Sequence, residues 1–274
     1  LVYVIFEDGT DIYWARSRVL EYMNALLGRL PQGVATTLGP DATGVGWIYE
    51  YSVEGQGQSL GELRAIQDWY IRYQLTSVPG VSEVASIGGF VMQYQVILDP
   101  NKLLAYNLPI NQVVAAIRGS NKQVGASMLE FTETEYMVRG LGYIKDIDDL
   151  KNVVISASPT GTPIRVRDIA QVSRGPEMRR GVAEKDGEGE VVGGVVVMRF
   201  GENPLRVIND VKKKLKEIEP GLPAGVKVLP AYDRSHLIHR SIETLKTTLI
   251  EQIIIVILTC VLFLWHLPSA LVAL

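Results

Sequence analysis

The chain has 274 residues, of which 47% are hydrophobic and 21% charged, a composition typical of globular proteins that bury an apolar core. Its formal net charge of −3 comes without a basic stripe, which argues against nucleic acid as a partner. The only cysteine is Cys260, which excludes an internal disulfide and a thiolate metal cluster.

The N-terminal segment is predicted to form a strand, a helix and a second strand. Residues 1–6 are apolar, and Thr10 or Asp11 in the turn that follows can cap a helix. Apolar residues then recur at helical spacing from residue 15 to residue 30, and Leu30-Pro31-Gln32-Gly33-Val34 ends the helix and begins a strand.

The same order of elements occurs twice more. Residues 60–75 are predicted to be helical, and a Pro-Gly turn leads from them into a strand at residues 84–87. Asn203-Pro204 opens another helix, which is followed by a Pro-Ala-Gly turn and a strand at residues 227–229. The apolar face of this helix comprises Val207, Ile208, Val211, Leu215 and Ile218. Three such units predict repeated βαβ folding, with the helices on one face of a sheet.

The middle of the chain, residues 93–171, has a different pattern. A strand is expected at residues 94–98 and a short helix at residues 109–117, and short strands with Gly and Pro turns make up the rest. This segment therefore looks like an insertion between the second and third units. The apolar strand at residues 193–200 that follows is expected to be buried on both faces.

The C-terminal segment carries no charge from Ile253 to Trp265. Extended back to Leu245, it becomes long enough to cross a bilayer, although the extension includes Lys246 and Glu251. A transmembrane helix is the favoured interpretation, and a buried helix of a soluble domain is the alternative. Since neither end of the chain resembles a natural terminus, we expect it to be a piece of a longer protein.

Two polar clusters suggest metal sites, but each has a simpler explanation. Residues 186–190 form a dense acidic run that lacks the ligand spacing of an EF-hand, so a solvated hairpin turn is favoured. His236, His239 and Glu243 share one helical face and suit zinc, but no fourth ligand is evident and a polar helix entry is favoured. No nucleophile–base pattern or phosphate loop can be assembled, so an enzyme is not expected.

Met178 differs from the methionines that suit core faces. It lies in the polar junction Gly175-Pro176-Glu177-Met178-Arg179-Arg180-Gly181, where no apolar neighbours surround it. Thioether sulfur favours Cu(I) and Ag(I), so Met178 is a candidate metal ligand, although from these residues alone an ordinary methionine is the favoured interpretation.

Several longer strings resemble one family of transporters. These strings are Phe6–Asp11, Leu38–Tyr49, Gly175–Gly181, Tyr232–Ser235 and Leu262–His266. Together they resemble the heavy-metal-efflux branch of the resistance-nodulation-division transporters, along essentially the whole chain and most closely its copper and silver pumps.

The resemblance implies an α+β architecture of repeated βαβ porter subdomains. Residues 1–41 would end the first porter subdomain, and residues 42–88 and 182–232 would form the second. Residues 89–181 would be an inserted mixed docking subdomain, and residues 240–266 a transmembrane helix.

The resemblance also implies a function, which is proton-driven export of heavy-metal cations from an inner membrane by a secondary transporter without a cofactor. Such a pump is a homotrimer embedded in the lipid bilayer, with this domain in the periplasm, and works with a periplasmic adaptor (membrane fusion) protein and an outer-membrane channel. The proton-relay residues and the main metal site would lie outside this chain.

Two positions concern the metal. Met178 matches a relay methionine proposed for Cu(I) or Ag(I), and Trp47 stands where zinc-type members tend to place a Glu ligand. The sequence therefore favours monovalent Cu(I) and Ag(I). The alternatives are a divalent Zn, Co or Cd pump of the same family and, from another class, a single-span, tail-anchored periplasmic binding or scaffold module.

Overall fold

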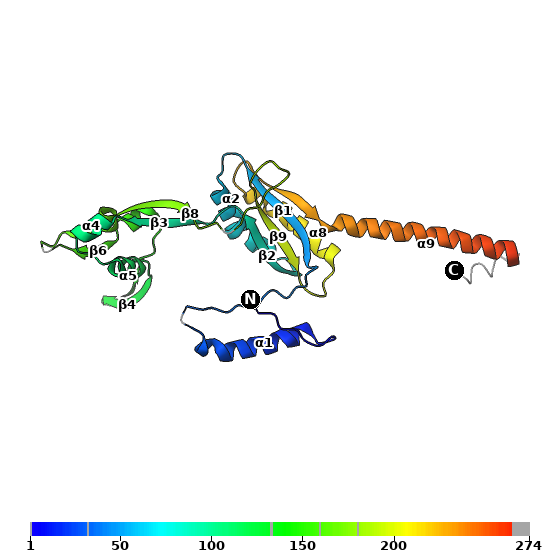
Figure 1. The fold of residues 1–274 in the computed structure, drawn as a ribbon, viewed down its shortest axis with the longest axis horizontal. Helices are drawn as coiled ribbons and strands as arrows, with labels where there is room; N and C mark the ends of the chain where they lie inside the picture. The colour runs from blue at the N-terminus through cyan, green and yellow to red at the C-terminus, as the bar shows by residue number, and fades with distance from the viewer. Residues whose placement is uncertain (1, 32, 132–133, 159, 180, 265–274) are drawn as a thin grey trace. The chain divides into compact units, whose positions relative to one another are not determined.

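The computed structural model describes residues 2–31, 33–131, 134–158, 160–179 and 181–264 of a mixed α and β fold (Figure 1). Its contacts divide into two units, Leu1–Gly89 with Gly181–Leu274 and Phe90–Arg180. We call the first the sheet unit and the second the inserted unit, and each is described by itself.

The sheet unit is built on a four-stranded sheet with the strand order β10-β1-β9-β2. These strands are β1 (Trp47–Gly55), β2 (Val81–Gly88), β9 (Val192–Met198) and β10 (Val226–Asp233). Every neighbouring pair in this sheet is antiparallel. All residues of the inner strand β9 except the last are buried, as predicted. The expected strand at residues 193–200 is wrong at its end, because β9 ends at Met198 and residues 199 and 200 are exposed.

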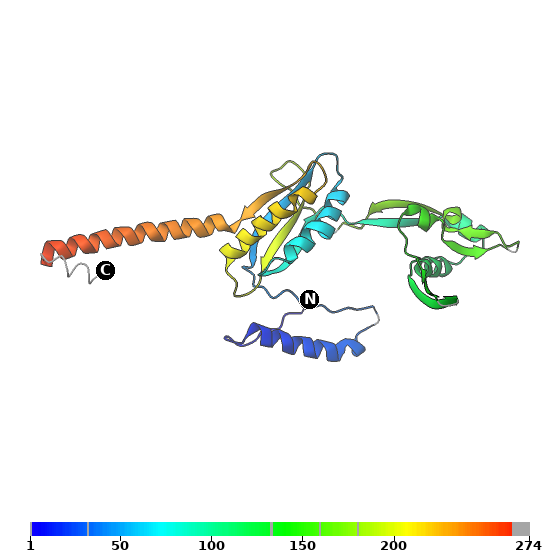
Figure 2. The same cartoon turned by 180° about the vertical axis from the view of Figure 1, so that it is seen from behind.

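Two helical segments lie on one side of this sheet (Figure 2). The first runs through α2 (Leu60–Ile66), a π-helical turn (Gln67–Ile71) and α3 (Arg72–Thr76), and Ser59 and Glu62 begin it with a capping box. The second is α8 (Pro204–Ile218), which Asn203 caps and η3 (Glu219–Gly221) follows. The predicted apolar face of α8 packs into the core, with Val207, Ile208, Val211 and Ile218 buried and Leu215 partly buried.

The connections give two interlocked βαβ units rather than a run of parallel strands. The helix after β1 leads to β2, and the helix after β9 leads to β10. In the sheet, β9 lies between β1 and β2, and β1 lies between β9 and β10. This split arrangement is the one of ferredoxin-like folds. The predicted βαβ pattern is thus confirmed for the second and third units.

The first predicted unit is only partly present. Its helix is α1 (Ile12–Leu26), followed by η1 (Leu27–Arg29), and the Asp11 carboxylate accepts a 2.7 Å hydrogen bond from the Trp14 amide. The expected strand at residues 1–6 is wrong for residues 2–6, and no strand follows Val34 before β1. The physical reason is that neither segment has a partner strand among the described residues, and an unpaired strand leaves its backbone groups without hydrogen bonds.

Among its described residues, the inserted unit contains three separate two-stranded ladders. They pair β3 (Met92–Leu98) with β8 (Ala170–Pro176), β4 (Val124–Phe131) with β5 (Thr134–Gly140), and β6 (Val154–Ala157) with β7 (Pro163–Arg165). Its helices are α4 (Pro100–Ala105), α5 (Ile110–Ser120), α6 (Ile147–Lys151) and α7 (Val166–Ile169). A second apolar core gathers around Val113, Val166 and Ile169, separate from the core of the sheet unit.

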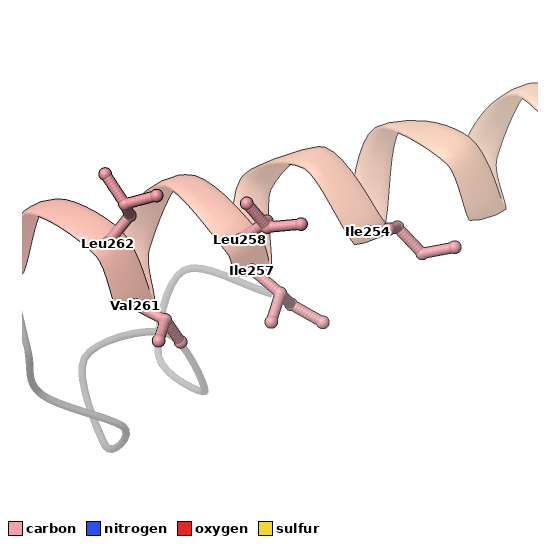
Figure 3. A pocket seen from close by; sticks show the side chains of 5 residues that line it. All are labelled: Ile254, Ile257, Leu258, Val261 and Leu262. Carbon is pink, nitrogen blue, oxygen red and sulfur yellow. The ribbon is translucent and has the colours of Figure 1, made fainter.

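The last element, α9 (Arg234–Leu264), begins directly after β10. A helix over residues 240–266 is therefore confirmed as far as Leu264, and residues 265 and 266 lie outside the described residues. Within the described part of the chain, no helix combines enough length with enough apolar character to cross a membrane. Figure 3 shows the aliphatic side chains that line a pocket along this helix, Ile254, Ile257, Leu258, Val261 and Leu262.

Candidate functional site

Met178, the predicted metal ligand, lies just beyond the end of β8 in the inserted unit. The β3–β8 ladder ends with Met92 opposite Pro176, and the Glu177 amide then donates a 2.8 Å hydrogen bond to the Val91 carbonyl. The Met178 side chain is 79% exposed. A thioether that is this accessible makes few apolar contacts and is free to meet a soft cation from solvent.

The two polar clusters that were weighed as metal sites do not assemble into one among the described residues. Across the described residues, no group of three or more His, Cys, Asp and Glu side chains is arranged to hold a metal ion. The acidic run at residues 186–190 is an exposed turn closed by a bridge between Glu184 and Glu190, in agreement with the favoured interpretation. His239 and Glu243 are exposed on α9, as a polar helix entry requires.

A polar cluster at the start of α9 was not predicted. The Asp233 carboxylate, at the end of β10, pairs with the Lys212 ammonium of α8 and accepts a 2.6 Å hydrogen bond from the Ser235 hydroxyl. Lys212 also donates to the Ser235 hydroxyl at 3.1 Å, and His236 Nε2 lies 3.5 Å from the carboxylate. These contacts tie the first turn of α9 to both the sheet and α8.

The cluster borders a pocket of about 370 Å³ in the sheet unit. The pocket is lined by Tyr49, Lys212, Leu215, Lys216, Glu219, Leu222, Val228, Pro230 and Asp233. Burial raises the pKa of Asp233, but the hydrogen bonds from Lys212 and Ser235 outweigh it and hold the pKa below its ordinary value of 3.8. Burial and the nearby Asp233 charge raise the pKa of Tyr49. Asp233 is therefore a fixed negative charge at neutral pH.

A second carboxylate, Asp41, joins the N-terminal segment to the sheet. It accepts a hydrogen bond from Ser82 of β2, lies 3.7 Å from the Arg199 guanidinium and accepts a 3.4 Å bond from the Tyr13 hydroxyl of α1. Burial acts to raise the pKa of Asp41, yet the Ser82 hydrogen bond and the Arg199 charge hold it below its ordinary value. The Phe200 amide also donates to the Asp41 carbonyl at 2.9 Å.

Sequence reasoning missed both carboxylates for a clear reason. Each carboxylate has a partner far away along the chain, Lys212 for Asp233 and Ser82 for Asp41, and only the tertiary fold brings these groups together. The one available signal was that Asp41 and Asp233 fall inside the strings that carry the family resemblance.

Trp47, the other position that bears on the metal, is the first residue of β1. Its side chain is exposed, and its backbone is in register with Val197 of β9. An indole has no lone pair to offer a metal ion, so this corner of the sheet unit presents a bulky apolar side chain rather than a ligand.

The sequence matches the AcrB/AcrD/AcrF family along residues 1–274. It is 54% identical to the cation efflux system protein CusA of Escherichia coli (strain K12) and 52% identical to the putative cation efflux system protein SilA of Salmonella typhimurium. Each alignment covers 99% of this chain and 26% of the relative. The cobalt-zinc-cadmium resistance protein CzcA of Cupriavidus metallidurans is 40% identical over the same shares.

Solved structures agree with these relatives. The crystal structure of a heavy metal efflux pump superposes with a TM-score of 0.88 at 34% identity, and it covers 97% of this chain and 26% of the pump. A second crystal form of a heavy metal efflux pump gives a TM-score of 0.86 at 33% identity. The chain thus spans about a quarter of the length of the relatives that it matches.

Proposed function

This chain belongs to the AcrB/AcrD/AcrF family, and from that premise we propose that it is part of a proton-driven pump that exports heavy-metal cations. The observation that carries the proposal is the 54% identity to a cation efflux protein over 99% of the chain. A pump of this kind is a secondary transporter rather than an enzyme. Family membership also favours the pump over a single-span binding or scaffold module.

The proposed cargo is Cu(I) and Ag(I). Identity is higher to CusA and SilA, at 54% and 52%, than to the cobalt-zinc-cadmium resistance protein, at 40%. The chemistry of Met178 supports the same choice, because an exposed thioether is a good ligand for soft monovalent ions and a poor one for Zn²⁺. Trp47 adds no ligand for a divalent ion.

We assign Met178 the role of a relay ligand. A single exposed thioether supplies one coordination bond and no chelate, so a bound ion can leave it for the next ligand on its path. In the described part of the chain, no group of three or more His, Cys, Asp and Glu side chains is arranged to hold a metal ion. A relay position needs this weak hold, because conduction requires that an ion leaves a site as readily as it enters.

The test is resistance conferred by the complete pump in cells. Met178→Ala is expected to lower the tolerated silver and copper concentrations, and Met178→Leu is expected to do the same, because leucine keeps the bulk but lacks the sulfur. Met92→Leu is the matched control, since Met92 is a partly exposed methionine of the same unit that faces Pro176 across the ladder. Unchanged resistance in both Met178 variants would remove the relay role.

The same cells separate the two kinds of cargo. The proposal expects resistance to silver and copper and none to zinc, cobalt or cadmium. Resistance to the divalent metals alone would favour the alternative represented by the cobalt-zinc-cadmium relative, and it would leave the family assignment intact.

The proposed assembly follows the family resemblance. The sheet unit would supply porter subdomains, with residues 1–41 from the first and residues 42–88 and 182–232 from the second. Residues 89–181 would dock to an outer-membrane channel and to the neighbouring copies of a homotrimer, with a periplasmic adaptor bound alongside. The complete pump would reside in the inner membrane, with residues 1–232 in the periplasm. The expected result from cross-linking the intact pump in cells is a trimer.

We further propose that residues 240–266 enter the lipid with the other helices of the complete pump. Support comes from the exposed aliphatic side chains along α9, which line one stretch of the helix (Figure 3). In a Cys260→Ser background, a cysteine at Leu237 should react with a membrane-impermeant maleimide in intact spheroplasts. A cysteine at Leu258 should react only after detergent is added, and equal labelling of the two would count against the proposal.

The Asp233 cluster would then couple α9 to the porter sheet. Since Asp233 and Lys212 join the start of α9 to β10 and α8, a tilt of the helix would pull on both elements. Resistance should fall in Lys212→Met, which keeps the length of the side chain but removes its charge.

A further inference from the structure

The β4–β5 hairpin of the inserted unit places two methionines directly opposite each other. Met128 of β4 is in register with Met137 of β5. Two residues further toward the turn, Glu130 is in register with Glu135. Leu129 lies opposite Tyr136 between these two pairs, and Phe131 lies opposite Thr134 beyond them. All eight of these side chains are exposed.

The alternation of the strands sorts these pairs onto two faces. Side chains two residues apart share a face, so the Met128–Met137 pair and the Glu130–Glu135 pair lie on the same side of the hairpin. The opposite side carries Phe131 and Tyr136, whose rings meet edge to face with their centroids 6.4 Å apart. One face is therefore aromatic and apolar, and the other combines two thioethers with two carboxylates.

From this register we propose that the Met128–Met137 pair, flanked by Glu130 and Glu135, is a binding site for a soft monovalent cation, Cu(I) or Ag(I). Residues directly opposite in an antiparallel pair have Cβ atoms about 4.5–5.5 Å apart. The methionine side chain has three rotatable bonds in all, so both sulfur atoms can reach one ion between the strands. Two thioethers are a suitable ligand set for a soft monovalent ion.

Exposure and charge support the same site. The side chain of Met128 is 53% exposed and that of Met137 is 87% exposed, so neither sulfur is used to fill a core. Two carboxylates directly opposite each other repel, which destabilises a hairpin unless a cation lies near them. A monovalent ion held by the two sulfur atoms would offset that repulsion.

The donor set argues against harder ions. Ca²⁺ and Mg²⁺ require six or more oxygen ligands including waters, and structural Zn²⁺ takes four ligands from Cys, His and carboxylate. The hairpin face offers only two carboxylates, and thioethers are not among the usual zinc ligands. Selectivity for Ag(I) over Zn²⁺ is therefore the distinguishing property of this site.

The inference takes its choice of ion from the proposed cargo, but its test requires no transport. In the full 274-residue chain labelled with ¹³C at the methionine methyl groups, each of the six methionines gives its own signal. Titration with Ag(I) should shift the Met128 and Met137 signals together, with one midpoint. Zn²⁺ at the same concentration should leave both in place.

Variants then separate a shared ion from two independent contacts. Met137→Leu keeps the apolar bulk, and it should weaken the Ag(I) response of Met128 by roughly 10–100-fold, the range for loss of a supporting group at a metal. Glu130→Gln with Glu135→Gln should weaken binding less and make it less dependent on salt. Met92→Leu, which faces Pro176, should change neither signal.

The outcomes are distinct from those of the relay test. Met128 and Met137 shifting at different midpoints, or Met128 responding equally well in Met137→Leu, would overturn the shared site. Either result would leave the Met178 resistance experiment unaffected. Conversely, a pump that exports only divalent metals could still show Ag(I) bound at this hairpin.

Discussion

The sheet unit and the inserted unit use their apolar residues in different ways. In the sheet unit, four strands and two helical segments share one continuous core, in which Ile71, Leu75 and Ile208 are completely buried. In the inserted unit a smaller core forms around Val113 and Val166, and the β4–β5 hairpin remains exposed on both faces. A two-stranded hairpin is at best marginally stable alone, so this one depends on contacts outside its own strands.

The difference indicates a division of labour. A continuous core resists local opening, which suits the sheet unit to transmit the position of α9. Separate ladders place side chains on a surface without committing them to a core, as the contacts with ions and partner chains proposed above for the inserted unit require. The predictions below test this contrast, beginning with the largest expected effect.

The first prediction compares one deletion in each core. Ile208→Ala should reduce the free energy of unfolding of the sheet unit by about 2–5 kcal/mol, because the emptied volume in a tight core refills only partly. Val113→Ala removes less and should cost the inserted unit roughly 1–3 kcal/mol. Hydrogen exchange measured by mass spectrometry reports each unit separately, and each variant should accelerate exchange only in its own unit.

The same experiment can show whether the two units unfold independently. If Ile208→Ala accelerated exchange around Val113 as strongly as around β9, the two cores would unfold as one, and the contrast between the units would not hold.

The second prediction uses one glycine from each unit. A Cβ on Gly194 of β9 would press against the Tyr51 ring and lie 2.8 Å from Gln67 Nε2. These two side chains are already joined, because the Tyr51 hydroxyl donates a 2.9 Å hydrogen bond to Gln67. Gly194→Ala should therefore cost about 1–3 kcal/mol, as overpacking of a dense core does. No heavy atom lies within 4 Å of a Cβ on Gly125 of β4, so Gly125→Ala should stay within about 0.5 kcal/mol.

Urea unfolding followed by tryptophan fluorescence suits the Gly194 variant, because Trp14, Trp47 and Trp69 belong to the sheet unit. The inserted unit has no tryptophan, so hydrogen exchange is the measurement for Gly125→Ala. An unchanged midpoint for Gly194→Ala would show that β9 can move away from Tyr51, contrary to the tight packing described here.

The third prediction concerns pH. The pKa of Asp233 is lower in the folded chain than its ordinary value of 3.8, so its contribution to stability is complete above that value and is lost as the pH falls through the folded pKa. At pH 7, Asp233→Asn should cost about 1–3 kcal/mol, the range for hydrogen bonds to a charged group. The difference from the unchanged chain should close below pH 3.8.

Asp148→Asn in the inserted unit is the matched control. Asp148 pairs with Lys151 on an exposed surface, where such a pair contributes less than about 1 kcal/mol. A constant gap between Asp233→Asn and the unchanged chain from pH 7 to pH 3 would show that packing, and not the charge of Asp233, stabilises the start of α9.

These comparisons also show how far the sequence could lead. Helical periodicity predicted the apolar face of α8, and Pro-Gly turns marked the strands that follow the helices. The pairing of strands was not predictable in the same way, because local alternation is identical in parallel and antiparallel sheets. Residues 2–6 have the pattern of a strand but find no partner among the described residues.

The candidate sites also differ in whether local sequence or strand pairing determines them. Met178 stood out through its polar neighbours and became the candidate ligand through the family resemblance, and the structure places it in the open. The Asp233–Lys212 pair and the Met128–Met137 pair could not, because each depends on strand order or register, and a slip of one residue would move Met137 to the other face.

The smallest expected effect lies in the hairpin, where the contrast between the units is sharpest. Glu135→Lys replaces a repulsive cross-strand pair with an attractive one opposite Glu130, and such pairs contribute about 0.2–1 kcal/mol. Amide exchange along β4 should slow accordingly, and the gain should shrink as salt screens the exposed charges. Thr134→Lys is the control, because its partner Phe131 carries no charge and no gain is expected. If the two lysine variants slowed exchange equally, or salt left the difference unchanged, repulsion between Glu130 and Glu135 would not be what loosens the hairpin. The reason for a cation at that face would then rest on the two thioethers alone.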